Sequence, residues 1–224
     1  SCRILQLAAG GTVGDGSGSD DATLRLMGSG QLQVGNAQTL RLRSDSLLVT
    51  SGSAPTITRL GGSGSYALLL EGAVSISKLD VSYVDNSGVQ LRIADAADII
   101  AFKNISYANM GALALAVDNV TGSPATLVFF NHSFGPVANT VGVLGSTNAI
   151  IVTMDVATCA ASCNGTELEN VGAGKEVMWV SGNTWQGLNA NWLDNANWSG
   201  GAPPTTSQTA LIVVTPNNPV ISIG

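Results

Sequence analysis

The sequence predicts an all-β protein folded as a right-handed parallel β-helix, a β-solenoid, with a Trp-rich C-terminal β segment. The first observation behind this prediction is a six-residue pattern that recurs at a nearly constant interval: KLDVSY at 78–83, FKNISY at 102–107 and FFNHSF at 129–134. The second is the composition, with only 11% charged residues and 27 glycines among 224 residues. Such a mixture is typical of short strands joined by turns, and parallel crossovers favour the right hand.

The recurring pattern extends beyond the three hexamers. Successive members of one polar column lie 24, 27 and 24 residues apart, and a further step of 24 leads back to PTIT at 55–58. A period of this length, carried by strands, is the signature of a solenoid whose coils bury their apolar side chains only against one another. We therefore expect equivalent outward positions on successive coils, about 4.8 Å apart, for four residues: Asp80, Asn104, Asn131 and Asp155.

Alternation along each strand assigns the neighbours of this column to the inner face. The side chains predicted to point inward are Val81, Ile105, Tyr83, Tyr107 and Phe134. His132 stands where the neighbouring coils have Val81 and Ile105. We expect it to be a buried, hydrogen-bonded core residue and not a catalytic base.

The chain divides into three segments by composition: an N-terminal strand and Gly/Asp loop (1–22), the solenoid coils (23–181) and a Trp-rich cap or start of a further β module (182–224). The loop at 10–21 carries Asp15, Asp20 and Asp21, which could chelate calcium. It lacks the regular nonapeptide spacing of calcium-binding β-rolls, so we expect a solvated loop.

Charge and cysteine content limit the kinds of partner and the cellular location that the sequence allows. The formal net charge is −6 and the pI is near 4.5, so few basic side chains are available to bind a phosphate backbone. This argues against nucleic acid as a partner. No apolar run approaches the roughly 18–20 residues of a membrane span. Cys159 and Cys163 can close a small disulfide loop, with free thiols as the alternative, and Cys2 remains without a partner in this chain. A disulfide suits an oxidising compartment, and we expect an extracellular or cell-surface location.

No catalytic constellation emerges, and we expect no enzyme, no cofactor and no bound metal. The single histidine cannot support a Ser-His-Asp triad or a multi-histidine metal site. Asp80 and Asp155 are expected three coils apart, roughly 14–15 Å. That distance exceeds the roughly 5–9.5 Å that separates the paired carboxylates of glycosidases.

Asn-X-Ser/Thr sequons raise the question of glycosylation at five sites: Asn104, Asn119, Asn131, Asn164 and Asn197. Chance matches are expected in a chain so rich in Asn, Ser and Thr. For Asn104 and Asn131, stacking in the repeat column is sufficient explanation, and attached glycans are the alternative.

The C-terminal segment contains the pattern W-x-G-x4-W-x5-W-S-x-G followed by Pro-Pro, carried by Trp185, Gly187, Trp192, Asn197, Trp198, Gly201 and Pro203. About 40 residues resemble a segment of large bacterial cell-surface and autotransporter-like proteins, where it introduces a β-solenoid domain. The resemblance implies a fold and a location, and no chemistry. The tryptophans can cap the end of the solenoid, or they can stack on sugar rings.

The last residues, 199–224, contain no charged side chain. Their β-runs ALIVV (210–214) and PVISI (219–223) could complete a neighbouring subunit by strand addition, or fold back onto their own chain. Together, these features predict a non-enzymatic extracellular structural or adhesive protein that associates with itself or with other surface components. The alternative is a carbohydrate-binding or carbohydrate-cleaving β-helix domain.

Overall fold

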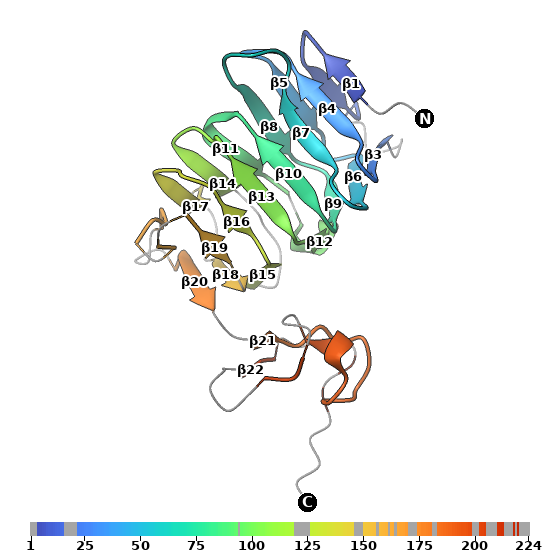
Figure 1. Ribbon diagram of the computed structural model, residues 1–224, viewed down its shortest axis with the longest axis vertical. Helices are drawn as coiled ribbons and strands as arrows, with labels where there is room; N and C mark the ends of the chain where they lie inside the picture. The colour runs from blue at the N-terminus through green and yellow to red at the C-terminus, as the bar shows by residue number, and fades with distance from the viewer. Residues whose placement is uncertain are drawn as a thin grey trace, which may run out of the picture.

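The computed structural model describes residues 4–15, 22–93, 95–118, 126–145, 150–155, 157–160, 162–163, 165–169, 174–180, 183–198, 202–204, 210–212, 217 and 219. Over these residues the chain winds into a β-solenoid of about six turns, built almost entirely from parallel strands (Figure 1). The predicted fold class is confirmed. In this part of the chain, no helix has the length and apolar character that crossing a membrane requires.

Each coil contributes strands to three walls that run along the solenoid axis. In the described residues, sheet A contains β1 (Ile4–Leu7), β4 (Gln31–Val34), β7 (Thr56–Arg59), β10 (Leu79–Ser82), β13 (Ile105–Ala108), β16 (Ser133–Phe134) and β19 (Thr158–Cys159). Sheet B contains β2 (Gly11–Val13), β5 (Thr39–Leu42), β8 (Tyr66–Leu70), β11 (Val84–Leu91), β14 (Leu113–Asp118) and β17 (Asn139–Leu144).

The third wall consists of two sheets that follow one another along the solenoid axis. Sheet C contains β3 (Ala22–Met27), β6 (Ser46–Ser51), β9 (Ala73–Ile76) and β12 (Ile99–Phe102), preceded by the short 3-10 helix η1 (Ala96–Asp98). Sheet D contains β15 (Thr126–Phe130), β18 (Ile151–Asp155) and β20 (Glu176–Val180). A bridge between Lys103 and Phe130 joins the two sheets.

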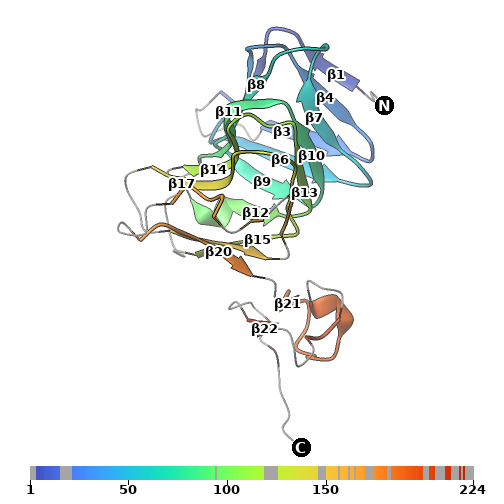
Figure 2. The ribbon, with the colours of Figure 1, turned by 60° about the vertical axis from the view of Figure 1, so that its left-hand side comes forward.

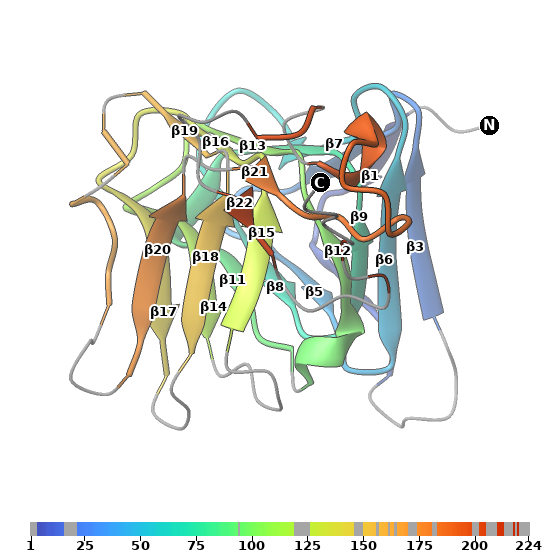
Figure 3. The same cartoon turned by 90° about the horizontal axis from the view of Figure 1, so that it is seen from below.

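The coil is right-handed. In Figure 3 the strands of the third wall run upward at the front, and the chain then passes over the top through sheet A. It returns behind through sheet B while advancing from the N-terminal to the C-terminal end. This hand is the one that parallel crossovers adopt almost without exception.

The core is a set of columns in which each apolar side chain lies on its equivalent in the next coil. The central column of sheet A is Leu5, Leu32, Ile57, Val81, Tyr107, Phe134 and Cys159. Leu32, Ile57 and Val81 are at most 1% exposed, whereas Leu5, in the first coil, is 45% exposed. Burial in this fold therefore depends on having a coil on both sides.

The register corrects the predicted polar column at both of its ends. Asp80 pairs with Ser106 rather than with Asn104, and Asp155 pairs with Phe130 rather than with Asn131. For Asp80 the cause lies between β11 and β12, because five more residues separate Leu91 from Phe102 than separate their partners Leu70 and Ile76. A constant 24-residue step cannot detect such an insertion. Asn104 and Asn131 are equivalent, as predicted.

The same shift makes the inward assignment of Tyr83 wrong. Tyr83 lies at the corner between sheets A and B with φ 63°, and it is half-buried. The Arg59 guanidinium carbon lies 3.7 Å from the centroid of its ring, a cation–π contact on the outer surface. Tyr107 takes the inward position beside Val81 instead.

In several coils the corner between the third wall and sheet A contains a residue with positive φ. Early coils use Gly28 (φ 63°) and Gly52 (φ 110°), and later coils use Asn104 (φ 55°) and Asn131 (φ 54°). A Cβ on Gly52 would lie 2.4 Å from the Gly28 nitrogen, so only glycine fits there. Asparagine tolerates the left-handed region better than other side chains, which explains why these two sequons recur at the coil interval.

Beyond β20 the chain forms a small module of its own, which Figures 1 and 2 place past the C-terminal end of the solenoid. Its parts are β21 (Asn183–Thr184), β22 (Ala210–Leu211) and the 3-10 helix η3 (Asn195–Asn197). The two strands pair in parallel, and a bridge joins Trp185 to Trp198.

Candidate functional site

The outer edge of sheet A carries a ladder of asparagine side chains along the solenoid axis. Asn131 Nδ2 donates to Asn104 Oδ1 at 2.7 Å, and Asn104 Nδ2 donates to the Ser77 carbonyl at 2.7 Å. Beside it lies a shallow hollow of about 310 Å³, lined in part by Lys78 and Asp80. The amide groups are thus engaged in coil-to-coil hydrogen bonds, which assigns the ladder a structural role.

Other outward polar side chains on sheet A do the same. Gln6 Nε2 donates to Gln33 Oε1 at 2.9 Å, and the hydroxyl oxygens of Thr58 and Ser82 lie 2.8 Å apart. Each bond connects a residue to its equivalent in the next coil. Neutral hydrogen bonds of this kind contribute about 0.5–1.5 kcal/mol each, so the outer surface adds to the stacking of the core.

Sheet B carries a ladder of charged residues that the sequence analysis missed. Leu42, Leu70, Leu91 and Val117 pair with one another in successive coils, and each is followed by a charged residue. These charged residues form one column in which the sign alternates: Arg43, Glu71, Arg92 and Asp118. Arg92 Nε lies 2.8 Å from Asp118 Oδ2, and Arg41 binds Glu71 at 2.7 Å. A charged residue directly after the last inward residue of each strand was the signal available in the sequence.

His132 is a buried core residue, as predicted. It is fully buried, and its Nδ1 lies 3.2 Å from the Tyr107 hydroxyl while its Nε2 lies 3.1 Å from the Phe102 carbonyl. Phe102, Phe129 and Phe134 have ring centroids within 6.3 Å of the imidazole. Burial lowers the pKa of His132 to about 4, although the bond to the Phe102 carbonyl acts in the opposite direction.

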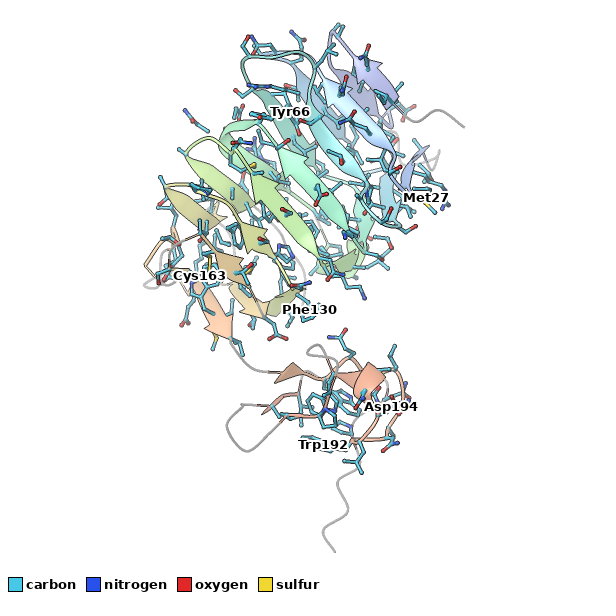
Figure 4. The ribbon with its side chains drawn as sticks, viewed as in Figure 1. Met27, Tyr66, Phe130, Cys163, Trp192 and Asp194 are labelled. Atoms are coloured by element: carbon cyan, nitrogen blue, oxygen red, sulfur yellow. A yellow bond between two sulfur atoms is a disulfide. The ribbon has the colours of Figure 1, made fainter. Side chains whose placement is uncertain are left out.

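The tryptophans of the C-terminal module pack on one another. Trp185 and Trp198 are at most 3% exposed, with ring centroids 5.1 Å apart. Trp192, labelled in Figure 4, is partly exposed and lies edge-on to Trp198 at 4.5 Å. The rings of Trp185 and Trp198 therefore form the core of this module, and neither presents a face for a sugar to stack on.

The start of the uncharged tail is held in the same module. Ala210 and Leu211 pair with Asn183 and Thr184, and Trp185 Nε1 donates to the Asn217 carbonyl at 2.7 Å. This arrangement corresponds to the tail folding back on its own chain at Ala210, Leu211 and Asn217. Most of the second run, PVISI (219–223), lies outside the described residues.

The sequon at Asn197 is inaccessible in the folded module, so the prediction that it can carry a glycan is wrong there. Asn197 is fully buried, and its Nδ2, the atom that would bear the sugar, donates to Asn189 Oδ1 and the Asn191 carbonyl. Asn104 and Asn131 commit the same atom to the ladder. Asn119 and Asn164 lie outside the described residues.

Cys159 and Cys163 form a disulfide at the last coil, as the CAASC spacing predicts. Cys2, Asp20 and Asp21 lie outside the described residues. The backbone N–H of Asp15 donates to a carboxylate oxygen of Asp45 at 2.8 Å. In the described part of the chain, no group of three or more His, Cys, Asp or Glu side chains is placed to hold a metal ion.

Comparisons with family models, with curated proteins and with solved structures find no match to this chain. The likeness of the C-terminal segment to bacterial surface proteins therefore rests on its tryptophan pattern alone. What the structure shows is the β-solenoid of about six turns. Function has to be inferred from the coils themselves.

Proposed function

We propose that the chain is a non-enzymatic structural or adhesive β-solenoid of the extracellular space or cell surface. One observation carries the proposal: the outward polar side chains of the coils bond to the same position in the next coil, as in the Asn104–Asn131 and Thr58–Ser82 pairs. A surface organised in this way reinforces a rod. Such rods, with few charges and a disulfide, suit a location where the protein must persist outside the cell.

Self-association is the second part of the proposal, and the first coil supports it. Leu5 of β1 is 45% exposed, although Leu32, Ile57 and Val81, its equivalents in later coils, are at most 1% exposed. A further coil stacked on β1 would bury this side chain by strand addition. If a second copy supplies that coil, the contact is heterologous and generates a linear filament.

Electron microscopy of the native material, with gold-labelled antibody against this chain, tests both parts. We expect label outside the cell, on thin fibres or on a surface layer. Label confined to the cell interior would contradict the proposed location. Label on isolated particles outside the cell would leave the location intact but contradict self-association.

A further inference from the structure

The outer face of sheet B contains a hollow of about 320 Å³ towards the C-terminal end of the solenoid. It extends across three neighbouring strands, β11, β14 and β17, and reaches Leu168 in the next coil. Three strand spacings amount to about 14 Å along the axis. A volume of this size lies at the lower end of the range for small-ligand sites.

The bulge in β11 builds one wall of this hollow. Val84 and Val89 pair with Tyr66 and Leu68, so the residues from Asp85 to Gly88 lie opposite a single residue of β8, Ala67. They are held in place, because Asp85 Oδ1 accepts from the Ser87 N–H at 2.9 Å and Asn86 Oδ1 accepts from the Ala112 N–H at 3.1 Å. Bulges commonly re-aim side chains next to binding sites.

The floor of the hollow includes the small side chain of Ala116 on β14. Gln90, Ala116 and Gly142 form one outward column, and Ala116 is 1% exposed. On the side away from the bulge, Leu144 and Leu168 are 39% and 40% exposed. An exposed aliphatic wall thus faces a wall of amide and hydroxyl groups.

Polar groups are available around this floor. Among the described residues, the Gln90 side chain has no hydrogen-bond partner, although it lies beside the floor. Arg92 and Asp118 close one end with an ion pair in which Arg92 Nε lies 2.8 Å from Asp118 Oδ2. Because this pair is neutral as a unit, the hollow offers hydrogen-bond donors and acceptors without a net charge to attract an ionic ligand.

We infer that this hollow, the sheet B groove, binds a neutral saccharide. A pyranose ring combines an apolar C–H face, which suits Leu144 and Leu168, with hydroxyl groups that can bond to Gln90 and to the Arg92–Asp118 pair. A peptide added as a strand is the less suitable occupant, because it requires a free strand edge. β11 and β14 are each paired on both sides.

The inference goes beyond the structural role and does not depend on it. The solenoid can form a rod whether or not the groove binds a ligand, and the groove can bind a ligand wherever the chain is located. Failure of the binding experiment below would leave the electron microscopy result untouched, and the reverse also holds.

Affinity electrophoresis of the full chain tests the inference, in native gels that contain soluble neutral polysaccharides (glucan, mannan, galactan or xylan) or acidic ones (alginate, polygalacturonate). We expect at least one neutral polysaccharide to retard the protein. Gln90→Ala removes a side chain that the fold does not use, and should weaken the retardation at least fivefold. Ala116→Leu should abolish it by filling the floor.

The matched control is Ala67→Leu, which adds the same side chain to the outer side of the same sheet two coils earlier. It should leave the retardation unchanged. Absence of retardation by every neutral polysaccharide would overturn the inference, as would binding to the acidic ones alone. Retardation that Gln90→Ala and Ala116→Leu both leave intact would place the binding site elsewhere and overturn it as well.

Discussion

Replacement of Phe129 by alanine is expected to lower the free energy of unfolding by about 3–5 kcal/mol, the range for removing a buried aromatic ring. Phe129 is 1% exposed, and its ring centroid lies 4.8 Å from that of Phe102 in the preceding coil. Removal of the ring leaves a cavity that the paired strands on either side cannot close. Urea unfolding followed by circular dichroism measures the loss.

The adjacent residue provides the control. Phe130 lies on the same strand, is only partly buried and points outward (Figure 4). Phe130→Ala should therefore cost no more than about 1 kcal/mol, as expected for a position away from the core. Equal losses for the two variants would mean that the register of β15 is off by one residue, since such a slip exchanges the two faces of a strand.

Acidification is expected to weaken the fold through His132. Its pKa falls from 6.5 in the unfolded chain to about 4 in the core, where burial disfavours the imidazolium. Between these two values the unfolded chain binds a proton that the folded chain does not. Stability is therefore complete above pH 6.5, and about 3 kcal/mol is lost as the pH falls to about 4.

His132→Gln isolates this effect, because glutamine keeps hydrogen-bonding groups for Tyr107 and the Phe102 carbonyl but does not titrate. The variant should be less stable than the natural chain at pH 7.5, and its stability should fall less steeply between pH 6.5 and 4. Identical slopes for the two proteins would contradict the assignment. An NMR titration of the imidazole in the natural chain gives an independent reading, with a pKa below 5 expected.

The sequence predicted those parts of the fold that repeat. Asn104 and Asn131 stand at the same place in two hexamers of the recurring pattern, so their equivalence could be predicted although the coils differ in length. His132 was assigned to the core because the recurring pattern has Val81 and Ile105 at its position. In each case a local pattern and the stacking of coils favour the same answer.

Features that occur once could not be predicted in this way. The segment between β11 and β12, which holds η1, is longer than its counterpart in the preceding coil, and it displaced Asp80 from its assigned column. The sheet B groove depends on the bulge in β11, on the small side chain of Ala116 and on the approach of Leu168 from another coil. Only the three-dimensional register brings these residues together.

The most direct test of the solenoid is an NMR experiment that detects couplings through backbone hydrogen bonds in the deuterated protein. The account predicts couplings from the Asp80 N–H to the Pro55 carbonyl, from the Arg92 N–H to the Leu70 carbonyl and from the Lys103 N–H to the Ile76 carbonyl, which are 2.8–3.0 Å apart. Each donor thus bonds to a residue about one coil earlier, without a reciprocal bond. Reciprocal pairs, in which two residues exchange both bonds as in an antiparallel sheet, would contradict it.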